Sequence, residues 1–321
     1  MSGTWRDAFL KILHWLRSHL QEDFKWGYYG SMAAFLGLCL GLNFYLLPDQ
    51  TIERWMTSRY YGKPAGFLAY FIFYGVPYLI ATLMHIGFHR DYALLRSLKF
   101  WGRFVLVLAV LALDAGFYTH RALYTLAETP AGNYALRRIV GNLSSVLTIF
   151  LPLLLVRALL DRKLESFYGL TWRNFDPRPY LILLGLMVPL VLAASFTEGF
   201  LNYYPTFKLQ IAARVESLPA WATVTLYESA YALDFVWEEL MLRGFMIVGM
   251  VAFMGRAAVM PMVAVYCFRH FAKPFGEALS SIFGGWILGV IALRSRSLMG
   301  GVLVHIGIAL MMELFAMLHK L

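Results

Sequence analysis

Long apolar runs separated by short polar stretches dominate the amino-acid sequence. They cover about residues 26–47, 65–86, 100–118, 139–160, 180–196, 221–253, 257–271, 278–293 and 298–318. A helix that crosses a bilayer needs roughly 20 apolar residues, so most of these runs are long enough to span. We therefore predict an all-α fold, a polytopic transmembrane helix bundle of about eight or nine spans.

The first 25 residues have a different pattern. Trp5, Ile12 and Leu16 recur at helical spacing, while Arg6 and Arg17 interrupt the apolar positions. This pattern is typical of an amphipathic helix lying in the membrane interface, and it differs from the uninterrupted apolar segment of a signal peptide.

Composition supports a membrane protein. Of 321 residues, 60% are apolar and 15% are charged, which argues against a soluble domain. The net charge of +9 suggests basic loops on the cytoplasmic side rather than a nucleic-acid partner. Basic residues are more frequent on the N-terminal side of the first five spans, so we predict a cytoplasmic N-terminus, in a bacterial cytoplasmic membrane. Cys39 and Cys267 lie in apolar runs and indicate no disulfide framework.

The pattern of apolar and ionisable residues divides the chain into three parts. We predict an amphipathic helix at 1–25, N-terminal transmembrane helices at 26–196, and a catalytic transmembrane core at 197–321. In the last part, ionisable residues gather inside apolar runs: Glu228, Asp234, Glu238, Glu239, Arg243, His270, His305 and Glu313. A charge at membrane depth costs several kcal/mol, so such a cluster indicates a functional interior.

The first candidate motif contains two adjacent glutamates. Glu239 and Arg243 are four residues apart, so they share a helix face and can pair. Glu238 then points about 100° away, toward another neighbour. Asp234 lies on nearly the face of Glu238, and two close carboxylates in low dielectric favour one that accepts a proton from water. The simpler interpretation is an ion pair that joins two helices.

Two further motifs contain histidines. Tyr266 and His270 share a face near the end of a short span, where the tyrosine ring can orient the imidazole. His305 follows Gly300 and Gly301, which let a neighbouring helix approach closely. Each histidine alone is also compatible with a hydrogen bond to a carbonyl group in a helix core.

The order Glu-Glu-x-x-x-Arg, aromatic-x-x-x-His, and His in a glycine-rich final span resembles the CPBP family, also called the CAAX protease and bacteriocin-processing or Abi family. Its members are intramembrane glutamate endopeptidases. The resemblance covers about residues 221–315, and a weaker similarity covers 168–176.

This resemblance implies a role for each motif residue. Glu238 and His270 would activate the hydrolytic water. Glu239 and Arg243 would complete the first motif, with Arg243 holding the carboxylates. His305 would stabilise the oxyanion.

One position departs from the family pattern. Ala309 stands where the family usually has Asn or Asp, so the second polar donor is missing. Losing one oxyanion donor can cost on the order of 100-fold in rate. Glu313 and the hydroxyl of Tyr266 are the two candidates to replace it.

The leading hypothesis is therefore a metal-independent integral-membrane endopeptidase without a cofactor. Its partners would be membrane lipids and a protein or peptide substrate, lipidated or not. A second interpretation makes the Glu/His/His set a zinc site, although the sequence has no HExxH motif. A third is a non-catalytic relative serving as a membrane scaffold or immunity protein, and a fourth is a proton-coupled transporter using Asp114, Glu228 and Glu313.

Overall fold

Helices form nearly all the regular secondary structure of the computed structural model, which describes residues 4–46, 51–60, 62–118, 122–123, 126–173 and 175–320. Within these ranges there is no β-strand beyond one isolated bridge between Phe167 and Leu170. The predicted all-α membrane bundle is confirmed. The predicted span at 26–47 is helical over Trp26–Leu46, and residue 47 lies outside the described residues.

The elements up to residue 160 include two short π-helical segments. They are α1 (Trp5–Asp23), α2 (Trp26–Gly41), η1 (Leu42–Leu46), α3 (Ile52–Thr57), η2 (Ser58–Tyr60), α4 (Ala65–His89), η3 (Leu94–Arg96), α5 (Leu98–Gly116), α6 (Pro130–Leu143), η5 (Val146–Phe150) and α7 (Leu151–Leu159).

The remaining elements include a third, longer π-helical segment. They are α8 (Arg178–Ala194), α9 (Glu198–Tyr203), α10 (Leu209–Ala212), α11 (Ala220–Glu239), η6 (Leu240–Val248), α12 (Val251–Met254), η7 (Gly255–Ala258), α13 (Val259–Arg269), α14 (Phe275–Ser295) and α15 (Met299–Lys320).

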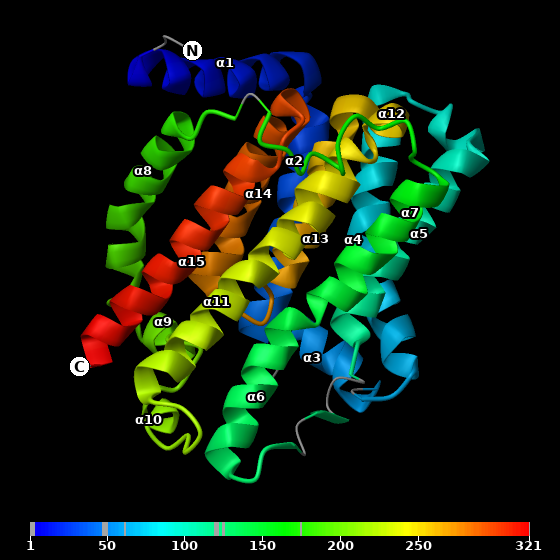
Figure 1. The fold of residues 1–321 in the computed structure, drawn as a ribbon. Coiled ribbons are helices and arrows are strands. Elements are labelled where there is room, and N and C mark those ends of the chain that lie inside the picture. The colour runs from blue at the N-terminus through cyan, green and yellow to red at the C-terminus, as the bar shows by residue number, and fades with distance from the viewer. Residues whose placement is uncertain are drawn as a thin grey trace.

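The N-terminal helix α1 lies across one end of the bundle, as Figure 1 shows. It starts with a capping box: the Thr4 hydroxyl accepts from the Asp7 amide at 3.2 Å, and the Asp7 carboxylate accepts from the Thr4 amide at 2.8 Å. Its buried face, which includes Ala8 and Ile12, packs against α14 and α8. A helix with one buried face thus occupies Trp5–Asp23 of the predicted segment 1–25, whose residues 1–3 lie outside the described residues, and its interfacial position stays a prediction.

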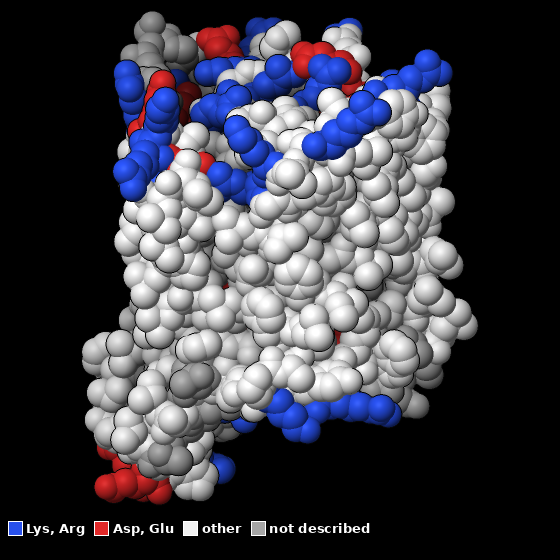
Figure 2. All heavy atoms as spheres, turned by 90° about the vertical axis from the view of Figure 1, so that its right-hand side faces the viewer, with Lys and Arg blue, Asp and Glu red and all other residues white. Residues whose placement is uncertain are grey.

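On the face that Figure 2 shows, a broad belt almost free of charged side chains, called the apolar belt here, separates two charged ends. On the face in Figure 2, lysine and arginine gather at the end where α1 lies, and a smaller group marks the opposite end. Six helices among the described residues are long and apolar enough to cross a membrane, and the helix Arg178–Ala194 is a shorter apolar one. The count of eight or nine spans stays a prediction.

The centre of the bundle is α13. All its residues from Val259 to Phe268 are buried, and it packs against α14, α4 and η6. A helix that is apolar all round belongs in a core. At 11 residues it is only about 16 Å long, too short to cross a bilayer alone. Its C-terminal end therefore brings His270 into the interior of the bundle.

A loop after α7 fixes the relative positions of η6 and α15. Its Tyr168 packs edge-on to Phe245 in η6, with ring centroids 5.2 Å apart. Next to it, the Gly169 carbonyl accepts from the Leu298 amide at 2.9 Å, just before α15. Gly169 has a φ of 86° and lies so close to Arg296 that a Cβ would be 3.1 Å from the Arg296 carbonyl oxygen.

The same loop is held by a buried ion pair. Arg103 of α5 donates two hydrogen bonds to the Asp161 carboxylate, at 2.7 and 2.5 Å. The Tyr168 hydroxyl donates to the same carboxylate at 2.6 Å. Burial, followed by this bond to Asp161, raises the pKa of Tyr168, so the phenol stays protonated as a donor.

We expect Asp161→Asn to destabilise the protein by about 3 kcal/mol, because it leaves the buried Arg103 without its counter-charge. Asp176→Asn is the matched control: Asp176 pairs with Arg178 at a half-exposed site, where an ion pair contributes below about 1 kcal/mol. Unfolding of the detergent-solubilised protein by heat or denaturant measures both. Equal losses in the two variants would contradict a structural role for the Arg103–Asp161 pair.

Candidate active site

The first motif lies where α11 changes into η6. Glu239 is the last residue of α11, and Arg243 lies in the nine-residue π-helical segment that follows. Both side chains are fully buried, and Arg243 Nη1 donates to Glu239 Oε1 at 2.7 Å. The predicted pairing of these two residues is confirmed. π-helical turns are often found at functional sites, and here every residue of the turn is buried.

The third motif meets the first at the same carboxylate. His305 Nδ1 lies 3.0 Å from Glu239 Oε1. A carboxylate only accepts, so Nδ1 carries the proton and Nε2 carries the lone pair when the ring is neutral. Gly301 makes this approach feasible, because a Cβ there would lie 2.2 Å from Glu239 Oε2. Gly300 and Gly307 of the same helix pack closely on Tyr180 and Leu184 of α8, as the glycine-rich pattern predicts.

Tyr266 of α13 connects the two histidines. Its hydroxyl lies 3.4 Å from His305 Nε2, and its ring meets the His270 ring edge-on with centroids 4.4 Å apart. The Arg243 guanidinium lies over the same ring, 4.4 Å from its centroid. His270 Nδ1 donates to the Tyr266 carbonyl at 2.8 Å, which leaves Nε2 of a neutral ring as a hydrogen-bond acceptor. Tyr266 thus contacts all three motifs.

Glu238 turns away from Glu239, as the helix geometry predicts, and its partner is Arg269. The Arg269 Nε donates to Glu238 Oε1 at 2.9 Å. Arg269 Nη1 also lies 3.6 Å from Asp114 Oδ2 on α5, and the Thr148 hydroxyl donates to Asp114 at 2.7 Å. The expectation that Arg243 holds both glutamates is wrong, because each glutamate has its own arginine.

A second set of polar side chains lies on one side of the His270 imidazole. Its Nε2 lies 3.8 Å from Glu277 Oε1 of α14. Glu277 also accepts from Lys273 at 2.7 Å and from the Tyr204 hydroxyl at 2.8 Å. Among the described residues no hydrogen bond joins His270 to Glu238. Sequence reasoning missed Glu277, although its spacing of four from Lys273 is a helical ion-pair signal.

Three other carboxylates make no hydrogen bond to the motif residues within the described part of the chain. Asp234 accepts from the Ser145 hydroxyl, and the Glu313 carboxylate accepts from the backbone amide and hydroxyl of Thr206. Glu313 is thus bound to another segment, so it does not replace the donor missing at Ala309, a buried residue. Glu228 has no hydrogen-bond partner among the described residues.

Several buried polar atoms of the network have no protein partner among the described residues: Glu239 Oε2, Arg243 Nε and Arg243 Nη2. Buried polar atoms are nearly always hydrogen-bonded, so these require water or a polar group of a bound molecule. The carboxylates and imidazoles of this site do not form a group of three converging ligand atoms; within the described ranges such a group occurs elsewhere.

Comparison with known proteins gives a family match for part of the chain. Residues 219–311 match the family model described as "Rce1-like: Type II CAAX prenyl endopeptidase Rce1-like". This segment, called the Rce1-like segment here, is similar to that family and spans less than half of the chain. The resemblance to the CPBP family is thereby confirmed. No curated protein and no solved structure matches the chain.

The Rce1-like segment contains all five predicted site residues, Glu238, Glu239, Arg243, His270 and His305. It also contains Tyr266 and Arg269, whereas Asp114, which lies next to Arg269, comes from the N-terminal helices. Arg269 directly precedes His270. A basic residue inside an apolar run is the sequence signal that could have identified Arg269 as a site residue. The helices outside the Rce1-like segment therefore contribute to the site.

We expect Gly301→Ala to destabilise the protein by about 1–3 kcal/mol, because the new methyl group displaces the Glu239 carboxylate from Arg243 and His305. Gly284→Ala in α14 is the control: its Cβ would meet no atom within 4 Å, and alanine favours the helix by up to about 1 kcal/mol. Thermal unfolding in detergent compares them. A Gly301→Ala protein as stable as Gly284→Ala would show that the close helix contact is absent.

Proposed function

We propose that the chain is an integral-membrane endopeptidase of the CAAX-protease type, which hydrolyses a peptide bond in a membrane-proximal protein or peptide. The contact that carries this proposal is the convergence on Tyr266 and Glu239: Tyr266 meets His270 and His305, and His305 meets Glu239. Three motifs distant in the sequence thus form one buried polar network. The Rce1-like match supports the same class of protein at a coarse level.

Glu238 is the proposed base. Arg269 binds its Oε1, so Oε2 is the oxygen left to accept a proton from water. Its side chain is 15% exposed, whereas Glu239 is fully buried, so Glu238 is the glutamate that water reaches. The water oxygen forms a bond to the carbonyl carbon, and the proton held by Glu238 passes to the leaving amine when the C–N bond breaks. His270, with Nε2 as the acceptor, orients this water.

Tyr266 is the proposed replacement for the donor missing at Ala309. His305 Nδ1 donates to Glu239, so a neutral His305 has only an acceptor at Nε2. In this state His305 does not donate to the oxyanion, which differs from the role that the family resemblance implies. The Tyr266 hydroxyl, 3.4 Å from that nitrogen, is a donor that can turn to an oxyanion. A neutral donor held in a site with little water stabilises the charge that develops on the carbonyl oxygen.

The proposed substrate class and membrane location rest on the apolar belt and the family match. The substrate would be a protein or peptide at the membrane, with or without a lipid group, and membrane lipids would surround the bundle. We propose a cytoplasmic N-terminus in a bacterial cytoplasmic membrane, since basic residues gather at the end where α1 lies (Figure 2).

We expect Glu238→Gln to abolish peptide cleavage and leave the fold intact, because an amide cannot take the proton from water. Glu228→Gln is the matched control, since Glu228 lies on the same helix and has no hydrogen-bond partner among the described residues. The assay uses the full chain in proteoliposomes with fluorogenic CAAX-type peptides, farnesylated and unmodified. A mass-spectrometric comparison of protein termini in cells expressing each variant extends it to native substrates.

Retained cleavage in a folded Glu238→Gln protein would reject the glutamate as base. The non-catalytic scaffold is the better description if two results occur together. The unchanged chain, Glu238→Gln and Glu228→Gln then cleave neither peptide, and cells expressing them contain identical protein termini. The zinc interpretation would require that activity is lost on chelation and restored by zinc.

We expect Tyr266→Phe to lower kcat by on the order of 100-fold with little change in KM, because it removes one oxyanion donor and keeps the ring between the histidines. Tyr78→Phe is the control, since the buried hydroxyl of Tyr78 has no hydrogen-bond partner among the described residues. Steady-state kinetics on the same peptides compares them. An unchanged kcat in Tyr266→Phe would assign the donor to another group.

A further inference from the structure

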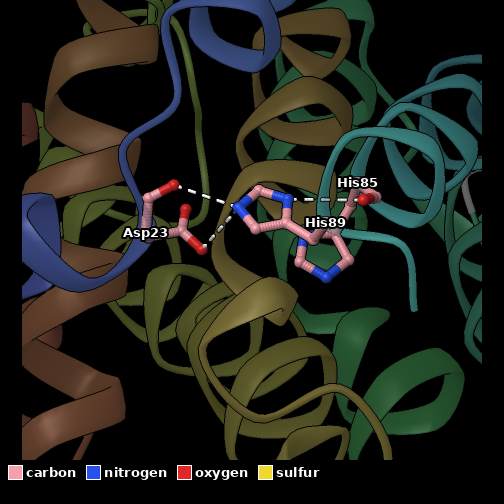
Figure 3. A group of neighbouring side chains, drawn as sticks. All are labelled: Asp23, His85 and His89. Carbon is pink, nitrogen blue, oxygen red and sulfur yellow. Dashed lines mark hydrogen bonds and ion pairs between the residues drawn. The ribbon is translucent and has the colours of Figure 1, made fainter.

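A second cluster of ionisable side chains lies where α1 meets α4, away from the motif residues. Figure 3 shows Asp23, the last residue of α1, beside His85 and His89, which are four residues apart near the end of α4. Each of the three offers one ligand atom, and these atoms lie within 4.8 Å of one another. Asp23 and His85 are buried, and the His89 side chain is 10% exposed.

The contacts of His89 require a cation. Its Nδ1 lies 3.3 Å from the His85 carbonyl oxygen, which can only accept. Its Nε2 lies 3.1 Å from the Asp23 carbonyl oxygen and 3.8 Å from Asp23 Oδ1. A neutral ring carries one proton, so the nitrogen without it points its lone pair at an oxygen, which is repulsive. A second proton or a metal ion between these atoms removes that repulsion.

The neighbouring atoms favour a metal ion over a proton. His85 Nδ1 and Asp23 Oδ1 are both buried without a hydrogen-bond partner among the described residues. A proton on His89 leaves His85 Nδ1 unsatisfied, whereas a metal ion can bind both imidazoles and the carboxylate. The two rings stack with centroids 4.3 Å apart and planes 17° from parallel, so binding one ion requires one ring to rotate. The nearest cation is Arg256, whose Nε lies 3.6 Å from Asp23 Oδ1. Its side chain is 46% exposed and lies equally close to Glu22.

We propose that Asp23, His85 and His89 bind a divalent transition-metal ion of the zinc class. Two imidazoles and one carboxylate form a common zinc ligand set, and histidines four apart on a helix present their rings on one face. The bond from His89 Nδ1 to a backbone carbonyl is the usual outer contact of a metal-bound histidine. The site would fasten the interfacial helix α1 to the transmembrane helix α4, and it shares no residue with the candidate active site.

The test uses the purified full-length chain in detergent, prepared with a tag that contains no histidine. After treatment with a chelator, the protein is titrated with Zn²⁺ against a chromophoric competitor, and bound zinc is counted by mass spectrometry. We expect one zinc ion per chain and a higher thermal midpoint in zinc than in chelator, because an ion that binds only the folded state stabilises it.

His85→Gln and His89→Gln each weaken binding by at least about tenfold, because each removes a direct ligand. His14→Gln is the matched control, since His14 is an exposed histidine on α1 outside the cluster. Size-exclusion profiles verify that each variant is folded. No stoichiometric zinc in the unchanged chain, or equal zinc affinity in His14→Gln, His85→Gln and His89→Gln, would overturn the proposal and leave a protonated His89 paired with Asp23.

Discussion

The charge of Glu239 constrains the packing of the whole C-terminal part of the chain. A carboxylate with no exposed surface in an apolar bundle loses its hydration, so it must be compensated by partners that are equally buried. Arg243 of η6 and His305 of α15 both bind the same carboxylate oxygen. To bring His305 there, α15 must approach α11 so closely that only glycine fits at position 301. One buried charge thus determines the distance between two helices.

The two adjacent glutamates acquire different environments from this constraint. Successive residues on a helix point about 100° apart, so binding Glu239 to Arg243 directs Glu238 toward α13 and its Arg269. Arg269 is in turn placed by Asp114 of α5 and lies over the ring of Tyr74 in α4. The helices before residue 197 therefore do more than anchor the chain, because they hold the counter-ion of the proposed base. The loop at Tyr168 contributes in the same way by fixing η6 and α15.

The few charged residues differ in their surroundings between the ends of the bundle and membrane depth. Those at the ends of the bundle lie in loops and on α1, outside the apolar belt of Figure 2. Most of those at membrane depth have specific partners, since an unpaired charge there is costly. The cluster at Asp23, His85 and His89 lies at the junction between these regions, where an interfacial helix must be held on a transmembrane one. The role that we propose for this cluster is attachment, whereas the role that we propose for Glu238 and Tyr266 is proton transfer and donation to the oxyanion.

Local sequence pattern determined the helical membrane class, the helix at the N-terminus and the pairing of Glu239 with Arg243, because helix periodicity and residues four apart depend only on neighbours in the chain. It also located His270 and His305 in the motifs that the family match supports. Only the tertiary structure decided that Arg269 rather than Arg243 holds Glu238, that Glu277 lies beside His270, and that Glu313 binds Thr206 instead of the site. These contacts join residues on different helices, and the side-chain packing that selects among several buried partners is not encoded in the spacing of any one helix.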